Sequence, residues 1–308
     1  MMEEHIITFP EQWITADKLE QALQQTSLSS FSNIAGIAFH FPASCRVMVD
    51  AAVRLLSLAN QLIAEGIPVT MVFESEQNGT ITYLNRANFF TLLSERVRVL
   101  PVRPDPTYAK RYQGQNRNLV EFASIGSRYS DHVESIPPRL ANALEVALEA
   151  RSDCTSLSRA AFTIFAELIT NVYDHSQTVL DGFAALQVYP QGGRVQVVVS
   201  DSGIGLLETL RPKLLTPTAK RLADAELIRS LFCDDLTWNK KEKGMGLPQC
   251  AYVALKYKGS VGIRLETCGI HLKPSLRGYE TNNIQYQQDL IMLKGTHICF
   301  SFPLDTLS

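Results

Sequence analysis

Residues 162–176 read FTIFAELITNVYDHS, and their apolar side chains recur at the spacing of an amphipathic helix. Glu167, Asn171 and His175 follow one another at intervals of four residues, so they share one face of that helix, with Asp174 beside them. An amide oxygen can complete the octahedral shell of a phosphate-bound Mg²⁺, and a carboxylate can take a proton from a nucleophile. The alternative is an ordinary solvated face on a core helix.

A second motif, RVQVVVSDSGIGL over residues 194–206, favours the functional interpretation. It begins with a strand-like apolar run, continues with Asp201 and carries glycines at 203 and 205. Gly203 and Gly205 let the backbone turn sharply and leave room for a ligand. Asp-Ser-Gly is also a good turn by itself, so a turn-forming aspartate is the alternative for Asp201.

Two further motifs follow in the last third of the chain. KGMGLPQC, residues 243–250, places Gly244 and Gly246 before an apolar helical pattern. A helix that starts near Leu247 offers unpaired N–H groups and a positive dipole end to an anion. GTHICFSFP, residues 295–303, opens a last strand with Gly-Thr.

Together and in this order, the four motifs resemble those of the GHKL ATPase superfamily. That superfamily includes gyrase-type and mismatch-repair ATPases, heat-shock chaperones, histidine kinases and anti-sigma-factor kinases. Its pattern is ExxxN on a helix, then DxGxG, then GxGL, then GT on a late strand, and the match covers about residues 155–303. The resemblance implies a Bergerat-type ATP-binding fold, which is an α+β two-layer sandwich, with ATP and Mg²⁺ as its cofactors.

The resemblance also implies a role for each matching residue. Glu167 would be the catalytic base, Asn171 would hold Mg²⁺, and Asp201 would accept a hydrogen bond from the adenine amino group. Thr296 would support Asp201, the alternative being an ordinary β-branched strand residue. The expected nucleotide-binding positions are Asn171, Asp174, His175, Asp201, Gly203, Gly205, Lys243, Gly244, Met245, Gly246, Leu247 and Thr296.

Residues 206–243 occupy the place of the superfamily's lid, a mobile segment that closes over ATP. We expect this segment to become ordered when nucleotide binds. Its lysines at 240, 241 and 243 could approach the phosphates, or they could form a solvated run of charge.

The N-terminal third alternates strand and helix patterns, which indicates a small α/β unit. Strands are expected near 5–9, 34–41, 67–73 and 97–102, and helices near 15–25, 44–65 and 84–96. Thr15 is the expected N-cap of the first of these helices. The order and length of these elements resemble a STAS domain, the fold of anti-sigma-factor antagonists. Ser44 is the closest match to the phosphorylated serine of those proteins, and a helix cap is the alternative for it.

The expected organisation is a STAS-like α/β domain over 1–103, a linker over 104–116 and the ATP-binding domain over 117–308. Pro104 and Pro106 mark the linker. In the ATP-binding domain, two adjacent prolines suggest a helix that begins near Arg139. The polar segment 266–294 is an insertion relative to a minimal module, and we expect a long loop that forms a surface for a protein partner.

Composition limits the class of protein. The chain has 308 residues, a net charge of -2 and 45% hydrophobic residues, so it has no basic footprint for nucleic acid and enough apolar residues for real cores. The six cysteines show no metal-ligand spacing, which favours reduced thiols. With no signal peptide and no apolar run long enough to span a membrane, a cytoplasmic location is expected.

Three functions fit these observations. The first is a Mg²⁺-dependent ATPase that acts as a conformational switch, and the second is a serine/threonine kinase of the anti-sigma type. The third is a module that senses ATP or ADP without catalysis. His132 lacks the sequence context of a phosphoacceptor histidine, so a self-phosphorylating sensor kinase is not expected. A protein partner would bind the STAS-like domain or the 266–294 segment, and the protein could also form a homodimer.

Overall fold

Alternating strands and helices build a parallel sheet in the N-terminal half. The structure is a computed structural model, and it describes residues 4–25, 34–75, 79–126, 131–175, 177–213, 223–224, 226–228, 246–274 and 284–305. The sheet has the order β1-β3-β5-β6, and its neighbouring strands are parallel. Its strands are β1 (Glu4–Thr8), β3 (Gly36–Phe41), β5 (Val69–Phe73) and β6 (Arg98–Leu100), and a separate short ribbon pairs β2 (Trp13–Ile14) with β4 (Arg46–Val47).

Seven antiparallel strands form a second sheet in the C-terminal half. Their order is β12-β11-β10-β13-β9-β8-β7, which places β9 and β13 side by side near the middle. The strands are β7 (Leu119–Ile125), β8 (Gly182–Tyr189), β9 (Arg194–Ser200), β10 (Ser260–Arg264), β11 (Gly269–Leu272), β12 (Ile284–Gln287) and β13 (His297–Pro303). The fold is therefore mixed α/β, as the sequence predicts.

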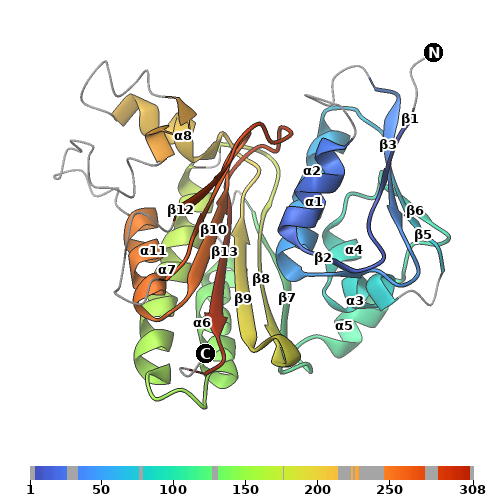
Figure 1. Cartoon of the computed structure of the whole chain (residues 1–308). Coiled ribbons are helices and arrows are strands. Elements are labelled where there is room, and N and C mark those ends of the chain that lie inside the picture. Colours follow the sequence, from blue (N-terminus) through green and yellow to red (C-terminus); the bar gives the residue numbers. More distant parts are fainter. Residues whose placement is uncertain are drawn as a thin grey trace.

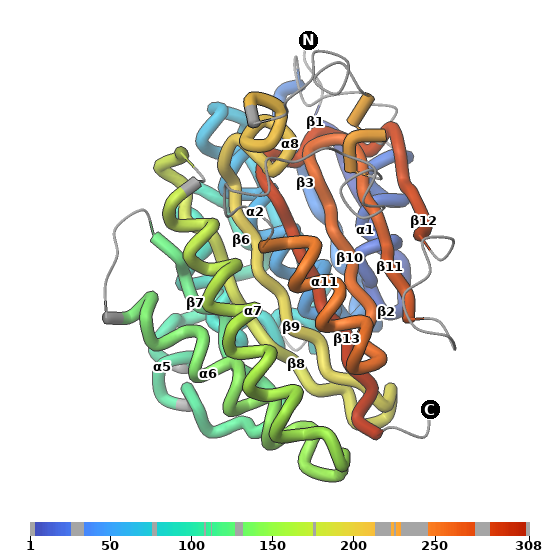
Figure 2. Tube along the Cα trace, turned by 90° about the vertical axis from the view of Figure 1, so that its left-hand side faces the viewer, coloured from blue at the N-terminus to red at the C-terminus, as the bar shows by residue number. Residues whose placement is uncertain are grey.

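Helices cover both faces of the seven-stranded sheet. Three of them, α6 (Asp131–Ala147), α7 (Cys154–His175) and α11 (Gly246–Lys256), lie across one face (Figure 2). On the other face, α1 (Ala16–Gln24) and α2 (Val49–Ala64) lie between the two sheets (Figure 1). Two apolar cores result: one lies under α6, α7 and α11, and the other joins the N-terminal half to residues such as Phe183, Val198 and Leu293.

Two local predictions about helix boundaries need correction. Helix α6 begins at Asp131, upstream of Pro137 and Pro138, and not after them. The prolines remove N–H donors, but Val133, Ile136 and Leu140 are all buried on one face, and this packing compensates for the loss.

The expected helix over 84–96 is two shorter helices, α3 (Gly79–Arg86) and α4 (Phe89–Leu92). They are separated at Asn88, whose φ of 70° places it in the left-handed region and ends the first helix. Its side-chain amide donates to the carbonyl oxygen of Phe122 at 3.0 Å, which fixes the break against strand β7. By contrast, the predicted N-cap at Thr15 is confirmed, because its side chain accepts from the N–H of Lys18.

Ser44 does not cap a helix. It lies exposed in a turn before β4, and α2 begins at Val49 with Met48 at its N-cap. Part of the expected 104–116 linker is also ordered as α5 (Pro106–Tyr112), which Asp105 caps by accepting from the N–H of Thr107 at 2.8 Å.

The segment 266–294 is only partly a loop. Its described residues include β11 and β12, which extend the seven-stranded sheet at one edge. Leu290, Ile291 and Leu293 are then buried. Apolar side chains in this stretch therefore pack inside the molecule, which leaves less of the segment for the partner surface that was expected.

Candidate functional site

Asp201 follows the last residue of β9 and is almost completely buried. Its Oδ1 accepts the N–H of Gly203 at 2.8 Å, and its Oδ2 accepts the N–H of Thr296 at 3.0 Å. Burial raises the pKa of this carboxyl group, and the hydrogen bonds from Gly203 and Thr296 oppose that shift. Each oxygen keeps a further lone pair for another donor.

Gly295 and Thr296 bind the last strand to this carboxylate. Gly295 has a φ of +90°, and a Cβ on it would lie 2.2 Å from the carbonyl oxygen of Asp201, so no larger residue fits there. The hydroxyl of Thr296 accepts the N–H of Leu206 at 3.0 Å. The second and fourth sequence motifs therefore meet at one place.

Glu167 lies against the start of α11. A Cβ on Gly246, the first residue of that helix, would lie 2.4 Å from Glu167 Oε1. The thiol of Cys250, one turn further along, has its pKa raised by burial and then by the charge of Glu167. The described part of the third motif, from Gly246 onward, therefore lies beside the first motif.

Asn171 and Asp174 continue along α7 toward the end of the sheet where Asp201 lies. Val172, next to Asn171, packs on Gly182, where a Cβ would lie 2.5 Å from Val172 Cγ1 and 3.6 Å from the Cα of Asp201. Asn171 is half-buried and Asp174 is exposed. For His175 the structure gives the backbone only.

Three expected positions, Lys243, Gly244 and Met245, lie outside the described residues, as does most of the expected lid. The start of the lid is described. It contains α8 (Gly205–Leu210) and a single turn, η2 (Arg211–Lys213). Gly205 has a φ of +78°, which agrees with the sharp turn expected of that glycine.

Helix α2 contacts both neighbours of Asp201, and no pattern in the sequence predicts these contacts. Ser57 shares a hydrogen bond of 3.1 Å with Ser200, and Gln61 donates to Ser202 at 3.0 Å. The Gln61 amide also exchanges two hydrogen bonds with the backbone of Lys294, two residues before Thr296. The N-terminal half therefore fixes the loop that carries Asp201.

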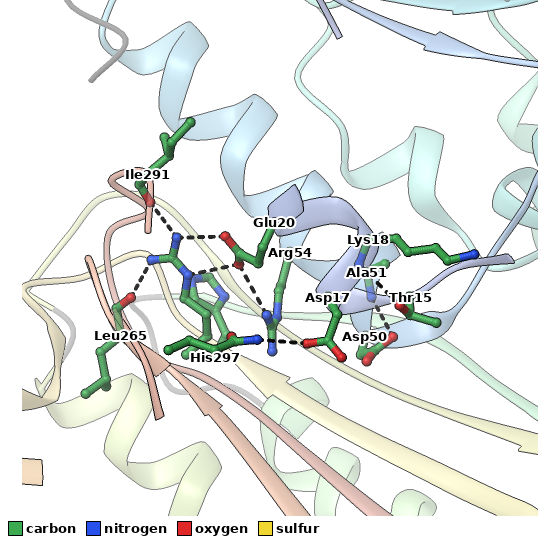
Figure 3. Close-up of polar contacts among 12 residues, drawn as sticks. Thr15, Asp17, Lys18, Glu20, Asp50, Ala51, Arg54, Leu265, Ile291 and His297 are labelled. Atoms are coloured by element: carbon green, nitrogen blue, oxygen red, sulfur yellow. Dashed lines mark hydrogen bonds and ion pairs between the residues drawn. The ribbon is translucent and has the colours of Figure 1, made fainter. Parts of the chain in front are cut away.

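A buried ionic cluster lies beside these contacts. The carboxylate of Glu20 on α1 pairs with Arg54 on α2 at 3.3 Å and with Arg264 on β10 at 3.0 Å. Arg264 also donates to the carbonyl oxygens of Leu265, Glu266 and Ile291. Figure 3 shows Glu20 and Arg54 with Leu265, Ile291 and His297 around them. This cluster joins α1 and α2 to the seven-stranded sheet.

His297 completes the link between the cluster and the site. Its Nδ1 shares a short hydrogen bond with the hydroxyl of Ser200, and its Nε2 lies 3.1 Å from the carbonyl oxygen of Lys294. Burial, followed by the charges of Arg54 and Arg264, lowers the pKa of His297 well below its ordinary value. The ring is therefore neutral near pH 7, and its hydrogen bonds connect the hydroxyl of Ser200 to the backbone of Lys294.

Comparison with known protein families gives no match, and comparison with curated protein sequences gives none either. In the described part of the chain, no three or more His, Cys, Asp or Glu side chains gather in a way that could hold a metal ion. The five cysteines of that part are free thiols. None of its helices has both the length and the apolar character needed to cross a membrane.

Proposed function

We propose that the seven-stranded half binds adenine nucleotide with Mg²⁺ as a GHKL-type domain of the Bergerat fold, and that the N-terminal half is STAS-like. The observation that carries this proposal is the buried carboxylate of Asp201, held by the N–H groups of Gly203 and Thr296 and packed against Gly295. Residues from separate motifs converge on it. Its remaining lone pairs suit the amino group of adenine.

The phosphate end of the nucleotide would lie between α7 and α11. The first N–H groups of α11 have no partner within the helix, and the dipole of the helix favours negative charge at that end. Gly246 brings no side chain there, and Glu167 occupies the space that a Cβ would need. The amide oxygen of the half-buried Asn171 is the ligand that this site offers to a phosphate-bound Mg²⁺.

The contacts of α2 support a function in which nucleotide binding changes the conformation of the protein. Ser57 and Gln61 bond to the residues on either side of Asp201, so a movement of the Asp201 loop would act directly on α2. Glu167 can activate either a water molecule or a hydroxyl group. The kinase function therefore keeps the same residues and differs only in the acceptor.

Replacing Asp201 by asparagine tests the proposal. We expect ATP affinity, measured by calorimetry with Mg²⁺, to fall about tenfold to 100-fold, because a hydrogen bond to a charged acceptor is worth about 1.5–3 kcal/mol. The asparagine side chain also directs an NH₂ group toward an N–H donor, so the unfolding midpoint is measured separately.

The matched control is Glu149→Gln, which alters an exposed carboxylate that follows α6. This variant should bind ATP like the wild type. Equal affinity in the wild type and in Asp201→Asn would refute the adenine assignment.

A further inference from the structure

A cavity lies at the other end of β9 from Asp201. It has a volume of about 770 Å³, opens to solvent and is lined by the β2–β4 ribbon, the start of α3 and the turn between β8 and β9. These elements belong to both halves of the chain and appear below α2 in Figure 1. The cavity shares no residue with the Asp201 site.

Two arginines and two aromatic rings form one wall of this cavity. The guanidinium of Arg46 lies 6.0 Å from the ring of Trp13, and that of Arg194 lies 5.8 Å from the ring of Tyr189. Trp13 and Tyr189 contact each other edge to face at 6.1 Å. The rings hold the two cations in place, so little side-chain entropy remains to be lost when an anion binds.

The positive charge of this wall has no matching anion in direct contact. Among the residues that the structure describes, neither Arg46 nor Arg194 forms an ion pair. Asp50, near the start of α2, interacts with Arg194 only at longer range, and burial raises the pKa of this carboxyl group. The described residues that line the cavity therefore include two cations, Arg46 and Arg194, and no carboxylate.

Buried donors point to the same kind of ligand. Tyr83 lines the cavity, and its hydroxyl is buried without a hydrogen-bond partner. The Nε of Arg194 is buried and unpaired as well. The hydroxyl of Tyr189 accepts the N–H of Val49 at 2.9 Å, which leaves its own hydrogen free to be donated. Unpaired buried donors cost free energy that a ligand oxygen can restore.

We propose that this cavity binds a small molecule in which an oxyanion is attached to a flat ring, such as an aromatic phosphate or carboxylate. The oxyanion lies between Arg46 and Arg194 and accepts from Tyr83. The ring lies against Trp13, which is 47% exposed although it is a large apolar residue. Because Trp13 and Arg46 come from the N-terminal half and Arg194 from the C-terminal half, the ligand bridges the two.

Phenyl phosphate and benzoate are the probes, and inorganic phosphate is the comparison. The chain has two tryptophans, so in a Trp238→Phe background the emission of Trp13 reports binding directly. We expect saturable binding of at least one probe. Arg46→Gln should weaken it by about tenfold or more, because a charge-assisted pair is lost. The control Arg159→Gln removes an exposed arginine of α7 and should change nothing.

Tyr83→Phe separates ligand binding from a structural role. Because the hydroxyl has no partner in the free protein, its removal should leave the unfolding midpoint unchanged or slightly higher while weakening the probe. Full binding in both Arg46→Gln and Tyr83→Phe would overturn the proposal, and so would the failure of both probes to bind. Phosphate that binds as tightly as phenyl phosphate would overturn the ring contact. A signal lost in Asp201→Asn would place the probe at the other site.

Discussion

Replacing Glu167 by glutamine should lower the turnover of ATP by about 10²–10⁴-fold and leave ATP affinity nearly unchanged. Glutamine keeps the size of the side chain and its hydrogen bonding, but it cannot accept a proton from the attacking group. Because Asn171 and the phosphates would hold the Mg²⁺, ATP affinity should change little and the loss should fall on the chemical step. Phosphate release under single-turnover conditions, together with calorimetry, measures the two effects separately.

Asn171→Ala is the matched comparison on the same helix. It should lose Mg²⁺-dependent binding and turnover together, because the proposed ligand of the metal is removed. In the switch, Glu167→Gln keeps ATP bound and free phosphate stops appearing. In the kinase, labelled phosphate moves to a serine or threonine of a partner, and the variant blocks that transfer. A wild-type protein that shows neither activity would leave the sensor as the function and remove Glu167 from any catalytic role.

Replacing Glu20 by glutamine should reduce the free energy of unfolding by about 3–5 kcal/mol, the usual cost of leaving a buried charge without its partner. Glu20 is the anion that pairs with both Arg54 and Arg264, and all three side chains are buried. Glutamine preserves the shape and removes only the charge. Urea unfolding followed by circular dichroism measures the loss.

The exposed pair of Glu65 and Lys294 provides the control. These side chains are 43% and 49% exposed and lie 2.7 Å apart, so Glu65→Gln should change the free energy of unfolding by only about 0–1 kcal/mol. A loss in Glu20→Gln no larger than in this control would show that the buried cluster does not hold α1 and α2 on the sheet.

The sequence predicts correctly those elements whose structure depends on short local patterns. The strand before Asp201, the helix around Glu167 and the cap at Thr15 each depend on neighbouring residues, and each lies where its pattern predicts. The structure gives the positions of most of the expected site residues, but their nucleotide-binding roles stay predictions. Lys243, Gly244 and Met245 lie outside the described residues.

The links between the two halves could not be predicted in the same way. Ser57 and Ser200 are far apart in the sequence, and a single hydrogen bond between them leaves no local pattern. Helix α6 contains two prolines because burial outweighs local preference. One sequence signal does indicate that helices cover both faces of the sheet. Strand β8 is apolar on both faces, with Phe183 toward one core and Ala184 toward the other, which is typical of a sheet covered on both sides.

Because helices cover both faces of the seven-stranded sheet, the C-terminal half depends on the N-terminal half for one of its two apolar cores. A fragment that began after α5 would keep the residues around Asp201 and Glu167 but would expose Phe122, Phe183 and Val198 to water. Such an uncovered apolar face favours aggregation. The two halves therefore do not behave as interchangeable modules. A different N-terminal half could replace this one only if it covered the same face of the sheet. It would need a helix equivalent to α2, with a residue that makes the contacts of Gln61.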